Sequence, residues 1–404
     1  MKTAMQRAIG SFRLPLEFAL TCTAFFSPAL AQSPEPLAIP VSQAGWFTFS
    51  GDTRALLAFN TELDGHTADA VADTGVTFTS IDRAFAVRFW PDTITPPSVA
   101  MSASGGTAAA ALGPVVDIAL PTRPTVRRRA IVTDHTGISS AAGHPVNVLL
   151  GMDVIGQGSL ELDLANKRWR FGDTGMSWLG FATVPIRYSA GRYLNYVEID
   201  VEGRPLHLAV DTGYDGGLML TTQAAVGTGL LRRGRITTIA IQGLGGLAVT
   251  QMLIPSNLRI GKFTLSDLEV QIDDGGGLPT KWRLDGLVGL NFLRRFHIAL
   301  DYPAGTMAYT PTDLPVPKAI RSTIGVQALP DGDGLAIVHV MANSPAARAG
   351  WTAGGRICAV DGIAIDNSPQ HTGPNPWNVA PAGTRVSFRF CDGSTKVLTA
   401  RNFY

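Results

Sequence analysis

Short segments in which apolar residues alternate with polar ones, or run continuously, recur along the chain between glycine-containing turns. The segments Leu56 to Ala72 and Leu194 to Val210 each contain an acidic residue followed by glycine near the middle, Asp64-Gly65 and Glu202-Gly203. Alternation around such a dipeptide predicts a β-hairpin with a two-residue turn. We therefore expect a mainly β protein.

The two hairpins belong to a longer internal repeat. Each hairpin ends in the same tripeptide, Asp73-Thr74-Gly75 or Asp211-Thr212-Gly213, at an offset of 138 residues. The same offset aligns Gly65 with Gly203, Val148-Leu149-Leu150-Gly151 with Gly286-Leu287-Val288-Gly289, and Asp163 with Asp301. Because the repeats of solenoids have roughly 20 to 50 residues, this spacing predicts two copies of a domain-sized unit. We expect two lobes that each bring one aspartate to a shared site.

The composition agrees with such a fold and excludes several functions. The 404 residues are 45% hydrophobic and only 16% charged, with 44 glycines and 26 prolines, which suits short strands joined by many turns. A formal net charge of +1 gives no electrostatic basis for a nucleic-acid partner. The 7 histidines are scattered and no HExxH, CxxC or phosphate-loop motif occurs, so we predict no metal and no other cofactor.

The first 31 residues predict a secretory signal peptide. Lys2, Arg7 and Arg13 form a basic start, residues 14–30 are mostly apolar, and Ala29-Leu30-Ala31 matches a small-residue cleavage site. The interrupted apolar run is shorter than the roughly 18 to 20 residues of a spanning helix, and the residues before Cys22 match a lipoprotein signal poorly. We expect an exported, soluble protein, either periplasmic or secreted.

The remaining chain divides into two lobes, 32–182 and 183–312, a proline-rich linker, 313–318, and a third module, 319–404. A third Asp-Thr-Gly, at residues 173–175, has no counterpart in the second repeat, so we interpret it as an ordinary turn. In the third module, Cys358 and Cys391 form a disulfide or remain buried free thiols, because sequence alone does not fix the distance between their β-carbons.

The two matched tripeptides are expected to lie where a buried strand ends. The glycine of each tripeptide permits a sharp backbone turn. Later in each repeat, Leu149-Leu150-Gly151 and Leu287-Val288-Gly289 predict buried strands whose glycines allow the backbone to approach an aspartate loop closely. Two copies with the same surroundings favour a functional site over a pair of turns.

These motifs resemble the aspartic proteases, in a bilobal pepsin-like arrangement with short retropepsin-like lobes of the bacterial type. The resemblance covers roughly residues 45–310 and implies that Asp73 and Asp211 are a catalytic pair that shares one proton and activates a water. It also implies that Thr74 and Thr212 hydrogen-bond across the lobe interface. Gly75 and Gly213 would donate backbone hydrogen bonds to the carboxylates or the substrate.

Two positions depart from the family pattern. Many pepsin-like enzymes have Ser or Thr after the glycine, whereas this chain has Val76 and Tyr214. Loss of a hydroxyl donor raises a carboxylate pKa, so we expect a pH optimum nearer mild acid or neutral than strong acid. Tyr214 is bulky and puts the second loop in question. Asp215 resembles a substrate-binding acidic residue of retropepsins, and a solvated turn aspartate is the alternative.

The resemblance also implies flaps. Ser104-Gly105-Gly106-Thr107 and Leu244-Gly245-Gly246-Leu247 occupy similar places in the two repeats. We expect a glycine-tipped hairpin from each lobe, with Gly105, Gly106, Gly245 and Gly246 near the substrate. A plain turn is the alternative for each.

The third module resembles a PDZ domain through Ser344-Pro345-Ala346-Ala347-Arg348-Ala349-Gly350 and Gly354-Gly355-Arg356-Ile357-Cys358-Ala359-Val360-Asp361-Gly362. PDZ domains bind peptide C-termini by strand addition, and Ile324-Gly325-Val326 resembles their carboxylate-binding loop. The expected groove helix, Asn367 to Ala382, contains four prolines. Peptide recognition and a structural or docking role therefore both stay open.

The function predicted from these features is that of an exported aspartic endopeptidase with a PDZ-like module for substrate or partner recognition. Its partner would be a polypeptide substrate, and a monomer is expected because one chain contains both lobes. The alternative is a non-catalytic peptide-binding protein on a degenerate protease fold.

Overall fold

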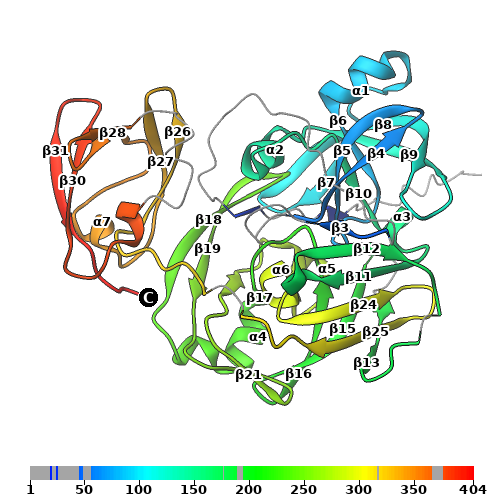
Figure 1. Ribbon diagram of the computed structural model, residues 1–404. Helices are drawn as coiled ribbons and strands as arrows, with labels where there is room; N and C mark the ends of the chain where they lie inside the picture. The colour runs from blue at the N-terminus through cyan, green and yellow to red at the C-terminus, as the bar shows by residue number, and fades with distance from the viewer. Residues whose placement is uncertain are drawn as a thin grey trace, which may run out of the picture.

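The computed structural model describes residues 19–20, 24–25, 45–48, 56–175, 177–188, 194–315, 318–365 and 376–404. They form two β-rich lobes, a sheet to which both lobes contribute, and a C-terminal module (Figure 1). The prediction of a mainly β, bilobal aspartic protease fold is confirmed. Within these ranges no helix is long and apolar enough to cross a membrane.

Most of the predicted signal peptide and residues 316–317 of the predicted linker lie outside the described residues. Within the segment predicted to be a signal peptide, the described residues are strands β1 (Ala19–Leu20) and β2 (Ala24–Phe25). The first pairs with β7 (Val99–Ala103) of lobe 1 and the second with β18 (Thr237–Gly243) of lobe 2.

Lobe 1 contains a sheet whose described strands follow the order β1-β7-β8-β4-β5-β10-β6-β9. The first predicted hairpin is confirmed, because Asp64 and Gly65 both have positive φ, 49° and 81°, as a type I′ turn requires. The elements are β4 (Ala58–Leu63), β5 (His66–Ala72), β6 (Ser80–Asp82), α1 (Arg83–Phe89), η1 (Pro91–Thr93), β8 (Gly106–Ala119), β9 (Val126–Thr133), α2 (Thr136–Ala142), β10 (Val148–Leu150) and α3 (Met152–Ile155).

Lobe 2 repeats this plan in a sheet with the order β2-β18-β19-β22-β17-β23-β16-β15-β20-β21, and β14 pairs with β15. Glu202 and Gly203, with φ of 55° and 83°, form the second predicted turn. The elements are β14 (Arg187–Tyr188), β15 (Asn195–Val201), β16 (Arg204–Val210), β17 (Leu218–Thr221), α4 (Thr222–Gly227), η3 (Leu230–Arg232), β19 (Gly246–Leu253), β20 (Leu258–Ile260), β21 (Phe263–Leu265), β22 (Val270–Asp273), α5 (Leu278–Trp282), β23 (Gly286–Val288) and α6 (Leu290–Leu293).

A third sheet joins the lobes in the order β13-β25-β24-β11-β12-β3. Its central pair places Glu161 of lobe 1 opposite Ala299 of lobe 2, and these positions are equivalent in the repeat. An approximate two-fold axis therefore passes between the lobes here. The elements are β3 (Phe47–Thr48), β11 (Ser159–Asp163), η2 (Leu164–Asn166), β12 (Arg168–Gly172), β13 (Ala182–Pro185), β24 (Phe296–Asp301) and β25 (Thr306–Pro311).

The buried Glu161 carboxylate links the two lobes within this sheet. It accepts hydrogen bonds from Arg170 Nε at 2.6 Å in lobe 1 and, at 2.8 Å, bonds with His297 Nε2 in lobe 2. Burial raises the pKa of Glu161, but the hydrogen bonds from His297 and Arg170 outweigh that effect and leave the pKa below its ordinary value.

The C-terminal module has its own sheet, in the order β26-β27-β28-β30-β31 with β29 beside β28, and its own apolar core. Its elements are β26 (Val326–Asp331), β27 (Gly334–Val340), α7 (Pro345–Arg348), β28 (Arg356–Val360), β29 (Ile363–Ala364), η5 (Pro376–Val379), β30 (Arg385–Phe390) and β31 (Thr395–Thr399). Cys358 and Cys391 form a disulfide, with Cα atoms 5.1 Å apart, which settles the choice between a disulfide and free thiols. Residues 367–375 of the expected groove helix lie outside the described residues.

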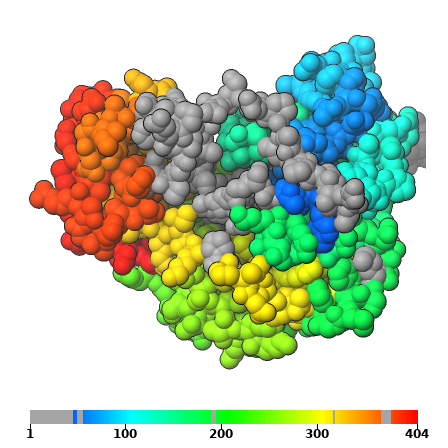
Figure 2. Space-filling model, viewed as in Figure 1, coloured from blue at the N-terminus to red at the C-terminus, as the bar shows by residue number. Residues whose placement is uncertain are grey.

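The module lies beside the β18–β19 hairpin of lobe 2 (Figure 1), and the space-filling view shows its red and orange surface next to the yellow and green surface of that lobe (Figure 2). Strand β27 of the module contacts strand β18 of the lobe. Met341, Phe403 and Tyr404 of the module share one apolar cluster with residues of lobe 2. The module is therefore docked on the protein rather than held by its linker alone.

Candidate active site

Asp73 and Asp211 occupy equivalent places at the ends of β5 and β16. Strand β10 pairs in parallel with β5, and the Asp73 N–H donates to the Leu150 carbonyl at 3.0 Å. Strand β23 pairs in parallel with β16, and the Asp211 N–H donates to the Val288 carbonyl, also at 3.0 Å. The offset of 138 residues in the sequence therefore corresponds to one local structure built twice.

The glycines that end β10 and β23 are packed against the aspartate loops, as their positions predicted. A Cβ added to Gly151 would lie 3.0 Å from the Val76 carbonyl oxygen and 2.7 Å from the Phe78 carbonyl carbon. A Cβ added to Gly289 would lie 2.3 Å from the carbonyl oxygen of Tyr214. Only glycine allows these approaches, because real Cβ atoms do not come so close to backbone atoms.

The two threonines form reciprocal hydrogen bonds across the lobe interface. Thr74 Oγ1 donates to the Val210 carbonyl at 2.7 Å, and Thr212 Oγ1 donates to the Ala72 carbonyl at 2.7 Å. Each hydroxyl also accepts from the backbone N–H of the other threonine at 3.0 Å. These four buried bonds hold the two loops in register, in the arrangement that the resemblance implied.

The two carboxylates are fully buried and face the interface between the loops. Asp73 Oδ1 accepts from the Gly75 N–H and Asp211 Oδ1 from the Gly213 N–H, both at 2.9 Å. A Cβ added to Gly213 would lie 2.2 Å from Asp73 Oδ2, so the Asp73 carboxylate of lobe 1 packs directly on the loop of lobe 2. The structure thus brings the predicted pair and its four supporting residues together.

Residues 59–154 and 197–292 each match a family model described as aspartyl protease. Both lobes thus match the aspartyl protease family model, which supports a two-lobe aspartic protease. The matched stretches contain the paired loops, the glycine strands and the threonine contacts, and they support a peptide-bond hydrolase. A comparison with curated proteins found no match.

The residues that follow the two glycines are both buried and differ between the protease lobes. Val76 is fully buried, and its carbonyl accepts from the Met152 N–H at 2.7 Å. Tyr214 is fully buried in the apolar cluster that includes Met341 and Phe403 of the C-terminal module. Burial raises the pKa of Tyr214 well above its ordinary value, and the charges of Glu269, Asp215 and Asp211 raise it further, so the phenol stays neutral. The bulky side chain is accommodated in an apolar cluster to which both lobe 2 and the module contribute.

The predicted flaps are hairpins that meet at their tips. Gly105 is in the turn between β7 and β8, and Gly245 in the turn between β18 and β19. The Gly245 N–H donates to the Ser104 carbonyl at 2.9 Å. A Cβ added to Gly105 would lie 2.1 Å from the Gly246 carbonyl oxygen, so glycine is required for this backbone contact. Gly106 follows in the same tip, with φ of 141°.

Asp215 is half-buried, two residues beyond Gly213, and it is close enough to Tyr214 to raise the pKa of that phenol. Asp173, in the third Asp-Thr-Gly, is exposed beyond the end of β12 and is not part of the paired loops. The described residues contain no group of three or more histidine, cysteine or acidic side chains placed to hold a metal ion.

One supporting residue was not predicted from the sequence. The Asp153 carboxylate accepts from the Thr79 N–H at 2.9 Å and from Thr79 Oγ1 at 2.8 Å. The Thr79 hydroxyl in turn accepts from the Gly151 N–H at 3.1 Å. In lobe 2 the position aligned with Asp153 is Asn291, so the internal repeat does not mark Asp153 as a supporting residue.

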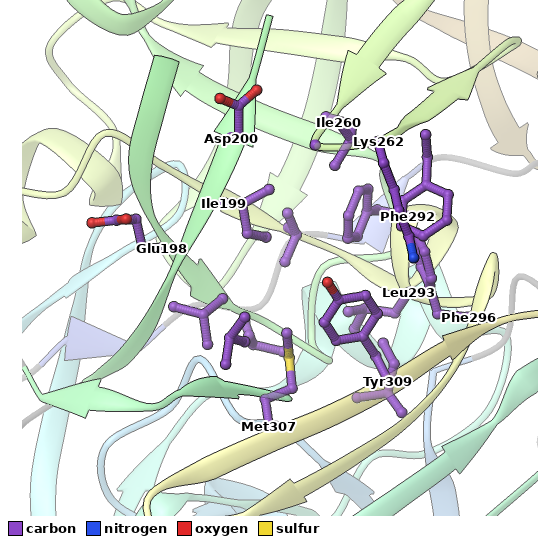
Figure 3. A pocket seen from close by; sticks show the side chains of 17 residues that line it. Glu198, Ile199, Asp200, Ile260, Lys262, Phe292, Leu293, Phe296, Met307 and Tyr309 are labelled. Carbon is purple, nitrogen blue, oxygen red and sulfur yellow. The ribbon is translucent and has the colours of Figure 1, made fainter. Parts of the chain in front are cut away.

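An apolar cavity of about 320 Å³ lies behind the second loop (Figure 3). Val210 and Val288, which directly precede Asp211 and Gly289, form part of its wall. Ile199 of β15 points into this space, and the neighbouring Glu198 and Asp200 also line it, with their carboxylates directed away from its centre. The cavity therefore lies next to the strands that end at the second aspartate loop, and its rim includes the exposed residues Glu198, Gly261 and Lys262.

Proposed function

We propose that this protein is an exported aspartic endopeptidase that cleaves polypeptides with a water activated between Asp73 and Asp211. The observation that carries the proposal is the reciprocal set of threonine hydrogen bonds, which holds two equivalent carboxylate loops face to face. Two such carboxylates share one proton, because like charges at close range do not both ionise readily. One group is then a base and the other an acid at the same pH.

In the proposed reaction, the ionised carboxylate takes a proton from the water as its oxygen attacks the carbonyl carbon of the peptide. The protonated carboxylate gives its proton to the carbonyl oxygen, which yields a neutral tetrahedral diol. Collapse of the diol breaks the C–N bond as the newly protonated carboxyl gives its proton to the leaving nitrogen and the other, now ionised carboxylate takes a proton from a diol hydroxyl. No covalent enzyme intermediate forms, and the carboxylate pair returns to its initial protonation state.

Two further features support the cellular and pH parts of the proposal. Export is supported by the predicted signal peptide and by the Cys358–Cys391 disulfide, since disulfides persist in oxidising compartments. An optimum at mildly acid to neutral pH is supported by Val76 and Tyr214, which stand where many pepsin-like enzymes have Ser or Thr after the glycine. We further propose a monomer, because one chain supplies both loops.

For the C-terminal module we propose a docking role in preference to capture of a peptide carboxylate. In the segment that resembles a carboxylate-binding loop, the Gly325 N–H already donates to Ser322 Oγ at 2.7 Å. Ile324 and Val326 are fully buried in the core of the module. Strand β26 would still accept a partner strand in a second, peptide-binding role.

The direct test is proteolysis of an unfolded polypeptide by the mature chain, compared with Asp73→Asn and Asp211→Asn variants over pH 3 to 8. We expect both variants to lose more than about 10³-fold in kcat/KM while retaining the wild-type circular dichroism spectrum. Equal activity in all three proteins would reject the mechanism. Tight binding of peptides without cleavage at any pH would instead favour the non-catalytic alternative.

A further inference from the structure

The C-terminal module binds the strand that leads to the tip of the second flap. Strand β18 ends at Gly243, and the tip that follows contains Gly245, which bonds to Ser104 of the first flap. Contacts from the module fall on the first half of this strand, between Ile236 and Ala240. The module therefore contacts the base of a hairpin whose tip contacts the opposite lobe.

Gln327 of β26 makes the most specific of these contacts. Its Oε1 accepts from the Ala240 N–H at 2.7 Å, and its Nε2 donates to the Ala240 carbonyl at 3.1 Å. One carboxamide thus satisfies both backbone groups of one residue, as a neighbouring β-strand would do. This pair of bonds fixes the position of β18 five residues before Gly245.

A second group of contacts lies next to the first. Thr238 Oγ1 accepts from the Ala342 N–H at 2.9 Å, which leaves its hydrogen for His339 Nε2, also at 2.9 Å. Burial lowers the pKa of His339, in agreement with an unprotonated Nε2 that accepts this bond. Thr237 Oγ1 donates to the Ala342 carbonyl at 2.7 Å.

We propose that Gln327 is a positioning residue for proteolysis and that the C-terminal module holds the second flap in the position in which its tip contacts the first flap. This inference rests on the proposed protease function. A flap that is held in place has little conformational entropy to lose when substrate binds beneath it, whereas a loosened flap must be ordered by the substrate. Loosening therefore weakens substrate binding more than it slows the chemical step.

The test uses the full mature chain with Gln327→Ala, and with Gln251→Ala as the matched control. Gln251 is exposed on β19, the other strand of the same hairpin, where it faces Thr238 in the register. Amide hydrogen exchange of β18 and steady-state kinetics are both measured. We expect exchange of the Ala240 amide to become at least tenfold faster in Gln327→Ala, with a KM raised about fivefold and kcat changed less than twofold.

A third variant, Gln327→Glu, keeps the acceptor for the Ala240 N–H but loses the donor to its carbonyl. We expect exchange and KM values between those of the wild type and Gln327→Ala. A purely structural contact would instead shift the unfolding midpoint without separating KM from kcat.

The outcomes separate this inference from the proposed function. Unchanged exchange at Ala240 in Gln327→Ala overturns the positioning role whether or not the enzyme is active. Faster exchange with unchanged KM in an active enzyme overturns it as well, and so does an equal effect from Gln251→Ala. If the wild type cleaves nothing, the proposed function fails, and the exchange data alone decide whether the module holds the flap.

Discussion

Thr74→Val is expected to destabilise the junction of the two lobes, because it removes a hydroxyl with two buried partners. The substitution leaves the Thr212 N–H and the Val210 carbonyl without the bonds of 3.0 and 2.7 Å that the hydroxyl makes. Each buried group left without its partner costs about 1–3 kcal/mol, so the free energy of unfolding should fall by about 2–6 kcal/mol. For a total stability of roughly 5–15 kcal/mol, that is a large fraction.

The assay is urea unfolding followed by circular dichroism, together with kcat on a peptide substrate. Thr74→Ser keeps the hydroxyl and should lose about 1 kcal/mol or less, which reflects the missing methyl group alone. Thr67→Val, at an exposed position of β5, the strand that leads to this loop, should change stability by less than about 0.5 kcal/mol. We also expect kcat of Thr74→Val to fall at least tenfold as the loops lose register. A Thr74→Val protein as stable as Thr67→Val, or a Thr74→Ser protein as unstable as Thr74→Val, would refute this reasoning.

Three other perturbations address different parts of the molecule. Gly213→Ala places a Cβ 2.2 Å from Asp73 Oδ2, so kcat/KM should fall more than about 10²-fold with little change in circular dichroism, and near-normal activity would contradict the packing. The pKa of Glu161 is lowered in the folded state, so its stabilising effect is present above the ordinary pKa of about 4.3 and is lost as pH falls through the lower folded value. Glu161→Gln should therefore be less stable at pH 7, and its urea midpoint should vary less with pH between pH 3 and 5. Parallel profiles of the wild type and the variant would contradict this. Replacing Cys358 and Cys391 together by serine opens a loop spanning 33 residues and should destabilise the module by about 3–4 kcal/mol in differential scanning calorimetry, whereas an unchanged transition would show that the disulfide is dispensable.

The sequence predicted the protease lobes well because their information is local and repeated. Three local features can be recognised in the sequence itself: an acidic residue and glycine in a two-residue turn, an aspartate after an apolar strand, and a glycine at the end of another buried strand. The offset of 138 residues then relates the two copies. In the structure, Glu161 and Ala299 differ by this offset and pair with each other at the two-fold axis. Repetition removed the ambiguity that a single Asp-Thr-Gly has, as Asp173 illustrates.

Contacts between distant segments of the chain have no comparable pattern in the sequence. Gln327 carries no pattern in the sequence that sets it apart, and only the placement of the module against β18 shows that it bonds to Ala240. Glu161 and His297 come from different lobes and meet only through strand pairing across the interface. Residues of this kind depend on tertiary geometry, which pattern and composition do not encode.

Tyr214 shows how the third module changes the meaning of a departure from the family pattern. In the aligned position lobe 1 has Val76, and from the sequence alone the bulkier residue looked like a defect beside the second aspartate. In the structure the Tyr214 ring is buried in an apolar cluster that Met341 and Phe403 of the module help to build, a neighbour that lobe 1 lacks. The two-fold symmetry of the lobes is therefore broken where the module docks, and the larger side chain fits that asymmetry. The same docked module thus shares an apolar cluster with the second aspartate loop and makes hydrogen bonds to β18 of the second flap.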